Sequence, residues 1–65
     1  MHDASKELEE KARWFGREAE IAEADAERAA ANGDTVRANT RKAEAEGYRE
    51  SEMKLRADIE RLRKV

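Results

Sequence analysis

The sequence predicts an all-α fold, a two-helix antiparallel hairpin with helices at about 4–31 and 35–63 that forms a dimeric antiparallel four-helix bundle. Three observations predict it. Charged residues make up 46% of the 65 residues and Pro is absent, a composition typical of long helices. One break interrupts the helical pattern, at residues 32–35. On both sides of this break, apolar residues recur at the heptad spacing of packed helices.

The first helix is expected to follow an N-cap at Asp3 or Ser5 and to end at residue 31. Its apolar positions follow one another at alternating steps of four and three residues over three heptads, which is an unbroken a/d register. They are Leu8, Ala12, Phe15, Ala19, Ala22, Ala26 and Ala29. This register predicts a continuous seam along which the helix associates with other helices.

The break between the helices combines a stop signal with a start signal. Gly33 can adopt the left-handed conformation that closes a helix. Asp34 or Thr35 can accept hydrogen bonds from the free amides of the next helix. Because two helices of nearly equal length are joined by so short a link, they must fold back antiparallel. Residues 1–65 are therefore expected to form a single helical-hairpin domain.

The second helix continues the register less strictly. Its seam positions are Ala38, Arg41, Ala45, Tyr48, Glu52, Leu55, Ile59 and Leu62. The long stems of Arg41 and Glu52 can cover apolar surface while their charges reach water, so we expect both at the edge of the core. Gly16 and Gly47 lie inside the helices, where each costs about 1 kcal/mol relative to Ala. A close helix approach or a soft spot would explain them, but we favour drift without a structural role.

Self-association follows from the size of the chain. A domain of 65 residues buries only about 60% of its unfolded surface and is marginal alone. The chain has no Cys and a single His, so neither a disulfide nor a usual zinc site can stabilise it. Oligomerisation is therefore the remaining way to stabilise so small a chain. Ala-rich seams specify the order of association weakly, so a trimer or tetramer stays open beside the dimer.

Side-chain size is distributed unevenly along the predicted hairpin. The large seam residues lie toward the open end, whereas the turn end is almost wholly Ala. They are Leu8, Phe15, Tyr48, Leu55, Ile59 and Leu62. Antiparallel stacking of two hairpins sets large residues against Ala layers, which native packing density favours. The first hypothesis is therefore a non-enzymatic oligomerisation or protein-interaction module, whose partner is itself or another helical protein.

Enzymatic chemistry, cofactors and membrane association are not expected. No nucleophile occurs with a base and an orienting group, and no Gly-rich phosphate loop is present. Glu20, Glu23 and Glu27 share neighbouring turns but lie off the seam. The only histidine, His2, precedes the helix, so we interpret these carboxylates as a solvated face rather than a metal site. With no transmembrane run or signal peptide, we predict a cytoplasmic location.

The pattern resembles the repressor-of-primer (Rop) family of small helical hairpins. The resemblance rests on chain length, a turn after about thirty residues, the first seam, and the run Ala12-Arg13-Trp14, where the family has Ala, Arg and an aromatic. It implies an antiparallel dimer that binds paired RNA loops through the outer face of the first helix, with Trp14 as the aromatic. The supporting positions of that face fall on Asp3, Glu10, Glu18 and Asp25.

All four of these supporting positions are acidic, whereas a surface that faces phosphate needs Lys or Arg. The net charge of −2 likewise provides no global field that favours nucleic acid. A Rop-like RNA-binding regulator is therefore the second hypothesis, and nucleic acid is not the expected partner. An engineered bundle without a natural function is the third; the composition fits it, but the two internal glycines do not.

A second surface lies beside the main seam of the first helix. It is the candidate face for an external partner, and its residues are Trp14, Glu18, Ile21 and Asp25. A Trp just off a core is either the rim of the oligomer interface or an anchor for another partner, because buried aromatics dominate binding hot spots. We favour the rim, with Met53 and Ala57 of the second helix packed beneath Trp14.

Overall fold

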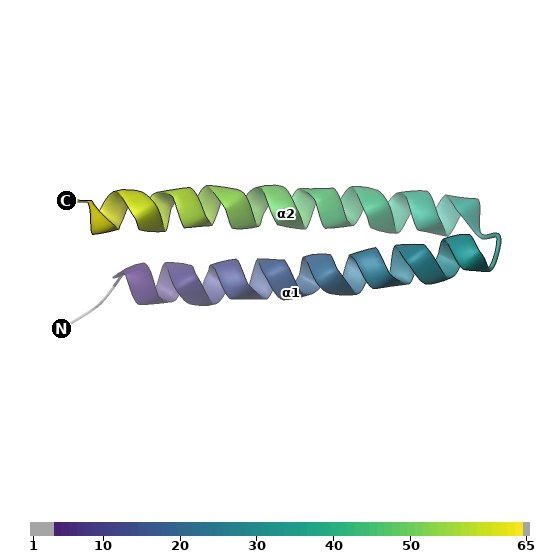
Figure 1. Ribbon diagram of the computed structural model, residues 1–65, viewed down its shortest axis with the longest axis horizontal. Helices are drawn as coiled ribbons and strands as arrows, with labels where there is room; N and C mark the ends of the chain where they lie inside the picture. The colour runs from purple at the N-terminus through teal and green to yellow at the C-terminus, as the bar shows by residue number, and fades with distance from the viewer. Residues whose placement is uncertain (1–3, 65) are drawn as a thin grey trace.

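The computed structural model describes residues 4–64, which form two helices, α1 (Ala4–Ala31) and α2 (Thr35–Arg63). The helices lie side by side and antiparallel, so the start of α1 and the end of α2 share one end, here called the open end (Figure 1). The molecule is a thin slab of 51 × 17 × 11 Å. The all-α hairpin and both helix ranges are thus confirmed. Neither described helix is apolar enough along its length to cross a bilayer.

The turn forms as its residues predict. Gly33 has a φ of 79°, in the left-handed region. Its amide donates to the Ala30 carbonyl at 3.0 Å and the Asp34 amide donates to the Ala29 carbonyl at 2.8 Å, which is a Schellman motif. The Asp34 carboxylate then accepts from the Arg37 amide at 3.1 Å as the N-cap of α2. Of the two expected N-caps of α1, Asp3 lies outside the described residues.

The contact between α1 and α2 is built almost wholly from alanine. Its buried apolar residues, each no more than 5% exposed, are Ala12, Ala19, Ala22, Ala29, Ala45 and Ile59. The larger seam side chains are less covered: Leu8, Phe15, Tyr48 and Leu55 are half-buried, and Leu62 is 48% exposed. The hairpin therefore brings the predicted seam together but leaves most of its large apolar side chains partly in water.

Gly16 lies at a close approach of the two helices, which favours a structural role over drift at this position. Gly16 is buried, and a Cβ atom added there would lie 2.8 Å from Oε2 of Glu52. The Glu52 carboxylate thus rests against the α1 backbone, in space that glycine alone leaves free. At Gly47 nothing in the described residues lies within 4 Å of an added Cβ outside its own stretch of helix, so drift still accounts for it.

Replacing Gly16 or Gly47 with alanine should change the free energy of unfolding by different amounts. Gly47→Ala is expected to raise the free energy of unfolding by about 1 kcal/mol, because Ala is the better helix former and the site is open. Gly16→Ala should raise the free energy of unfolding by clearly less, because the new methyl group displaces the Glu52 carboxylate. Chemical denaturation at one fixed protein concentration measures both.

The control for this comparison removes the obstructing carboxylate. In a Glu52→Ala background, Gly16→Ala should recover a gain close to that of Gly47→Ala. Equal gains from the two glycine substitutions in the wild-type background would show that the contact between Gly16 and Glu52 has no energetic consequence.

Candidate interaction site

An aromatic cluster near the middle of the hairpin joins the two helices. Trp14 and Phe15 come from α1, with ring centroids 5.1 Å apart and planes at 75°. Tyr48 of α2 lies 6.1 Å from Trp14 at 89° and 6.3 Å from Phe15. Edge-to-face ring pairs contribute roughly 0.5–1.5 kcal/mol beyond their area burial. Phe15 sits on the predicted seam, and Trp14, one residue earlier and so about 100° around the helix, faces outward.

A groove of about 470 Å³ runs beside this cluster. Its lining residues are Lys11, Trp14, Phe15, Ser51, Lys54 and Leu55. We call this surface the aromatic face. The sequence pattern did not single out Lys11 or Ser51, although the signal was present. Lys11 precedes Trp14 by three residues and Ser51 follows Tyr48 by three, a spacing that places each pair on one side of its helix.

The expected packing of Met53 and Ala57 beneath Trp14 is wrong. Met53 is 71% exposed, and Ala57 is exposed as well. Met53 instead borders a separate groove that includes Glu23. The axial heights of Trp14 and Met53 do match, but helical rotation turns Met53 to the other face of the slab.

The face opposite the aromatic cluster is ionic at the open end. A second groove there is lined by Glu9, Arg13, Arg56, Ile59, Glu60 and Arg63. The two grooves share no lining residue, and Lys11 and Arg13 lie on opposite sides of the buried Ala12, so the grooves open on opposite faces. On this side, Nη2 of Arg63 lies 2.6 Å from Oε1 of Glu9 and links the two helices. We call this surface the ionic face.

A chain of ion pairs continues the ionic face toward the middle of the hairpin. Arg49 donates to Glu23 at 3.0 Å and to Glu52 at 3.1 Å, and Arg56 donates to Glu52 at 3.1 Å. Hydrogen bonds from Arg49 and then Arg56 lower the pKa of Glu52, against burial, which raises it. Hydrogen bonds to Glu23 and Glu52 raise the pKa of Arg49. Glu52 therefore stays ionised beside Gly16. The sequence predicted that its charge would reach water, but it is paired with Arg49 and Arg56 instead.

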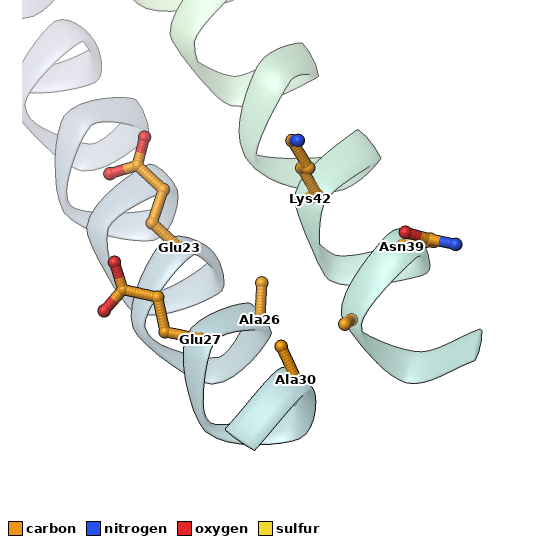
Figure 2. Close-up of a pocket in the computed structure, with 7 residues that line it drawn as sticks. Glu23, Ala26, Glu27, Ala30, Asn39 and Lys42 are labelled. Atoms are coloured by element: carbon orange, nitrogen blue, oxygen red, sulfur yellow. The ribbon is translucent and has the colours of Figure 1, made fainter. Parts of the chain in front are cut away.

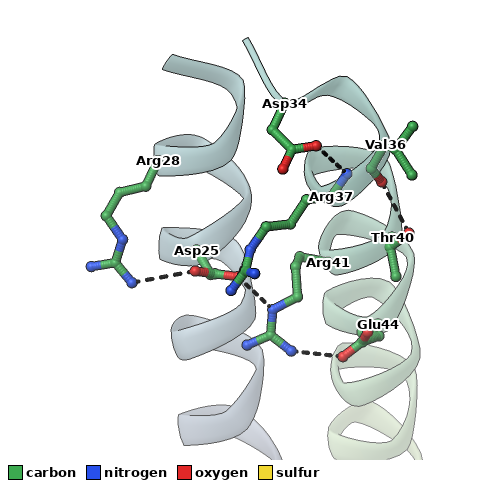
Figure 3. A network of polar contacts seen from close by, with 8 residues as sticks. All are labelled: Asp25, Arg28, Asp34, Val36, Arg37, Thr40, Arg41 and Glu44. Atoms are coloured by element: carbon green, nitrogen blue, oxygen red, sulfur yellow. Dashed lines mark hydrogen bonds and ion pairs between the residues drawn. The ribbon is translucent and has the colours of Figure 1, made fainter. Parts of the chain in front are cut away.

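Asp25 links the helices near the turn, as Figure 3 shows. Its Oδ2 accepts from Nε of Arg41 at 2.9 Å and from Nε of Arg37 at 3.1 Å, while Arg28 lies 3.6 Å from Oδ1. Burial raises the pKa of Asp25, but the hydrogen bonds and charges of Arg37 and Arg41 outweigh it, and the net shift is downward. We call these residues the Asp25 clamp. Arg41, the other polar seam residue, is paired here and also with Glu44 at 2.7 Å.

No protein-family model, curated protein or solved structure matches this chain. The resemblance to the Rop family therefore stays a prediction. The role of the aromatic face is inferred from its own residues and from what the rest of the hairpin leaves uncovered.

The residues of the predicted external face meet different surroundings. Trp14 and Ile21 are each 48% exposed. Glu18 is half-buried and forms no ion pair with any residue in 4–64. The side chain of Asp25 is only 15% exposed because it is held in the Asp25 clamp. No group of three His, Asp or Glu side chains within the described range is arranged to hold a metal ion.

The alanine-rich surface near the turn opens on the ionic face. It is a groove of about 390 Å³ lined by Glu23, Ala26, Glu27, Ala30, Ala38, Asn39 and Lys42. Figure 2 shows the methyl groups of Ala26 and Ala30 between the helices, with the carboxylates of Glu23 and Glu27 outside them. Glu23 belongs also to the ion-pair chain with Arg49. The aromatic cluster and this Ala groove therefore lie on opposite faces of the slab.

Proposed function

We propose that this hairpin is a homodimerisation module, in which two copies associate through their aromatic faces into an antiparallel four-helix bundle. One observation carries the proposal. Ile59 is the only buried residue larger than Ala among the described ones, while Trp14, Ile21 and Leu62 are each 48% exposed. Val36 and Met53 are more exposed still but lie away from the groove of the aromatic face. Trp14 lines that groove together with Phe15 and Leu55, and an uncovered apolar patch of this kind marks an interaction surface.

The free energy available from this burial is large relative to the stability of so small a chain. Fully burying one large apolar side chain contributes about 1.5–3 kcal/mol. Trp14, Phe15 and Leu55 all line the groove of the aromatic face, where a second hairpin would cover them. Because small domains have total stabilities of only about 5–15 kcal/mol, covering these three residues supplies much of what the Ala core lacks.

A second copy fits the aromatic face because the charges there are mixed. Lys11 and Lys54 line the groove, and Glu18 lies one turn beyond Trp14 on α1. A twofold dimer uses the same patch on both subunits, so a patch that carries both signs of charge can complement itself. RNA binding has no such support, because the surface around Trp14 is not a continuous basic patch.

The test is the molar mass in solution. Sedimentation equilibrium at micromolar concentration should give twice the chain mass of 7.4 kDa. The unfolding temperature should fall on dilution, because folding and association are linked by mass action. A stable, folded monomer at micromolar concentration contradicts the proposal. A trimeric or tetrameric mass would preserve self-association but reject the four-helix bundle.

A further inference from the structure

Building on the proposed dimer, we infer that its twofold axis passes beside Trp14, so that α1 packs antiparallel on the partner's α1. Each Lys11 then pairs with the partner's Glu18. Two features of the aromatic face support this axis, its charges and the position of the Asp25 clamp, and the area that the overlap covers is compatible with a dimer.

The charges on α1 are arranged symmetrically about the aromatic cluster. Lys11 lies three residues before Trp14 and Glu18 four residues after it, so all three share one stripe of the helix. Lys11 and Glu18 lie at equal distances on either side of the midpoint between Trp14 and Phe15. An antiparallel twofold axis at that midpoint brings each Lys11 opposite the partner's Glu18.

Neither of these two charges is paired within the part of the chain that the structure describes. Lys11 lines the groove of the aromatic face, and no ion pair joins it to any residue from 4 to 64. Glu18 is half-buried and likewise unpaired over that range. Every other half-buried carboxylate discussed above has a basic partner. A half-buried carboxylate loses hydration, and a cation from a second copy would compensate for it.

The competing register places the two copies of α1 in full overlap, with the axis between Arg17 and Glu18. In that register Glu18 lies opposite the partner's Arg17, with the partner's Glu18 one residue further along, and Lys11 lies opposite the partner's Ala24 rather than a carboxylate. Moving the axis to Trp14 is a shift of about three residues, or about 4.5 Å at the helical rise. The axis at Trp14 also places the Asp25 clamp of one copy beside the partner's Ala4. In the competing register the clamp lies closer to the partner's aromatic rings.

The overlap covers an area in the range of a stable dimer. An axis at the midpoint of Trp14 and Phe15 leaves about 22 residues of each α1 in register, or about 33 Å of helix. The slab is 17 Å wide, which gives a footprint of about 560 Å² per hairpin. Interdigitating side chains bury more accessible surface than a flat footprint does. The buried area therefore approaches the ~800 Å² per partner of standard interfaces.

Charge reversal tests the arrangement. The single variants Lys11→Glu and Glu18→Lys should each weaken the homodimer by about tenfold in Kd, because two attractive pairs become repulsive. An equimolar mixture of the two variants should regain the affinity of the wild type, since one chain carries Glu at both positions and the other Lys. The double variant should also regain it. Sedimentation with a fluorescent label on one variant measures each Kd.

A matched control uses the ionic face. Arg13 and Glu20 are exposed, opposite in charge and seven residues apart, like Lys11 and Glu18. Arg13→Glu and Glu20→Arg should leave the Kd unchanged, alone or mixed. Circular dichroism confirms that every variant remains helical.

The outcomes distinguish the inference from the proposed function on which it rests. A Glu18→Lys homodimer as tight as the wild type, or a mixture no tighter than the single variants, overturns the axis while the dimer stands. A wild-type chain that is monomeric at micromolar concentration overturns both. Recovery in the mixture, without recovery in the mixture of control variants, supports the pairing of Lys11 with the partner's Glu18.

Discussion

Replacing Phe15 with Asp is expected to abolish the dimer and the cooperative unfolding of the hairpin together. Phe15 is half-buried, lies 5.1 Å from the Trp14 ring and 6.3 Å from the Tyr48 ring, and lines the groove of the aromatic face. Truncating a packed Phe costs about 3–5 kcal/mol before a carboxylate is added to the apolar site. That loss approaches the whole stability of a small domain.

Sedimentation and far-ultraviolet circular dichroism on the same Phe15→Asp sample would show a monomer with little helix. The matched control is Met53→Asp, which introduces the same carboxylate at an apolar residue that is 71% exposed and lies away from the aromatic face. Met53→Asp should remain a helical dimer. A helical dimer of Phe15→Asp would instead show that the interface lies elsewhere on the slab.

Ile59→Ala is the second substitution with a large expected effect. Ile59 is 5% exposed and is the only residue larger than Ala in the described core of the hairpin. Truncating a buried Ile costs about 2–5 kcal/mol, and in a domain of this size that lowers the unfolding temperature by roughly 10 °C or more. Thermal unfolding followed by circular dichroism, at a concentration where both proteins are dimeric, measures the shift.

Val36→Ala is the control for Ile59→Ala, because it removes a β-branched side chain that is 79% exposed. Val36→Ala is expected to change the free energy of unfolding by no more than about 0.5 kcal/mol. If Ile59→Ala shifted the unfolding temperature no more than Val36→Ala, the alanine contact alone would hold the helices, and the side chain of Ile59 would add nothing to it.

The backbone of this protein could be predicted from the sequence because its signals are local. Gly33 and Asp34 each act on amides and carbonyls within five residues, so the ends of both helices follow from the turn residues themselves. The heptad register likewise reports which edge of each helix faces the other. Neither inference requires the relative position of residues that are distant in sequence.

The faces of the slab could not be predicted in the same way. A heptad register identifies the line of contact between two helices but not which side of that line a neighbouring residue takes. Met53 illustrates this, because it shares the height of Trp14 yet lies on the other face. The contact of Glu52 with Gly16 depends on the axial offset and separation of the helices, which only the folded hairpin specifies.

The alanine contact has a consequence for how the helices are aligned lengthwise. The buried alanines are all of one size, so side-chain volume along their contact distinguishes one lengthwise alignment from another less than side chains of varied size would. Oppositely charged residues pair across the helices at several heights: Glu9 with Arg63, Glu23 with Arg49, and Asp25 with Arg41. Salt weakens such pairs. The order of charges along the two helices therefore contributes to their lengthwise alignment, together with the aromatic cluster and Ile59.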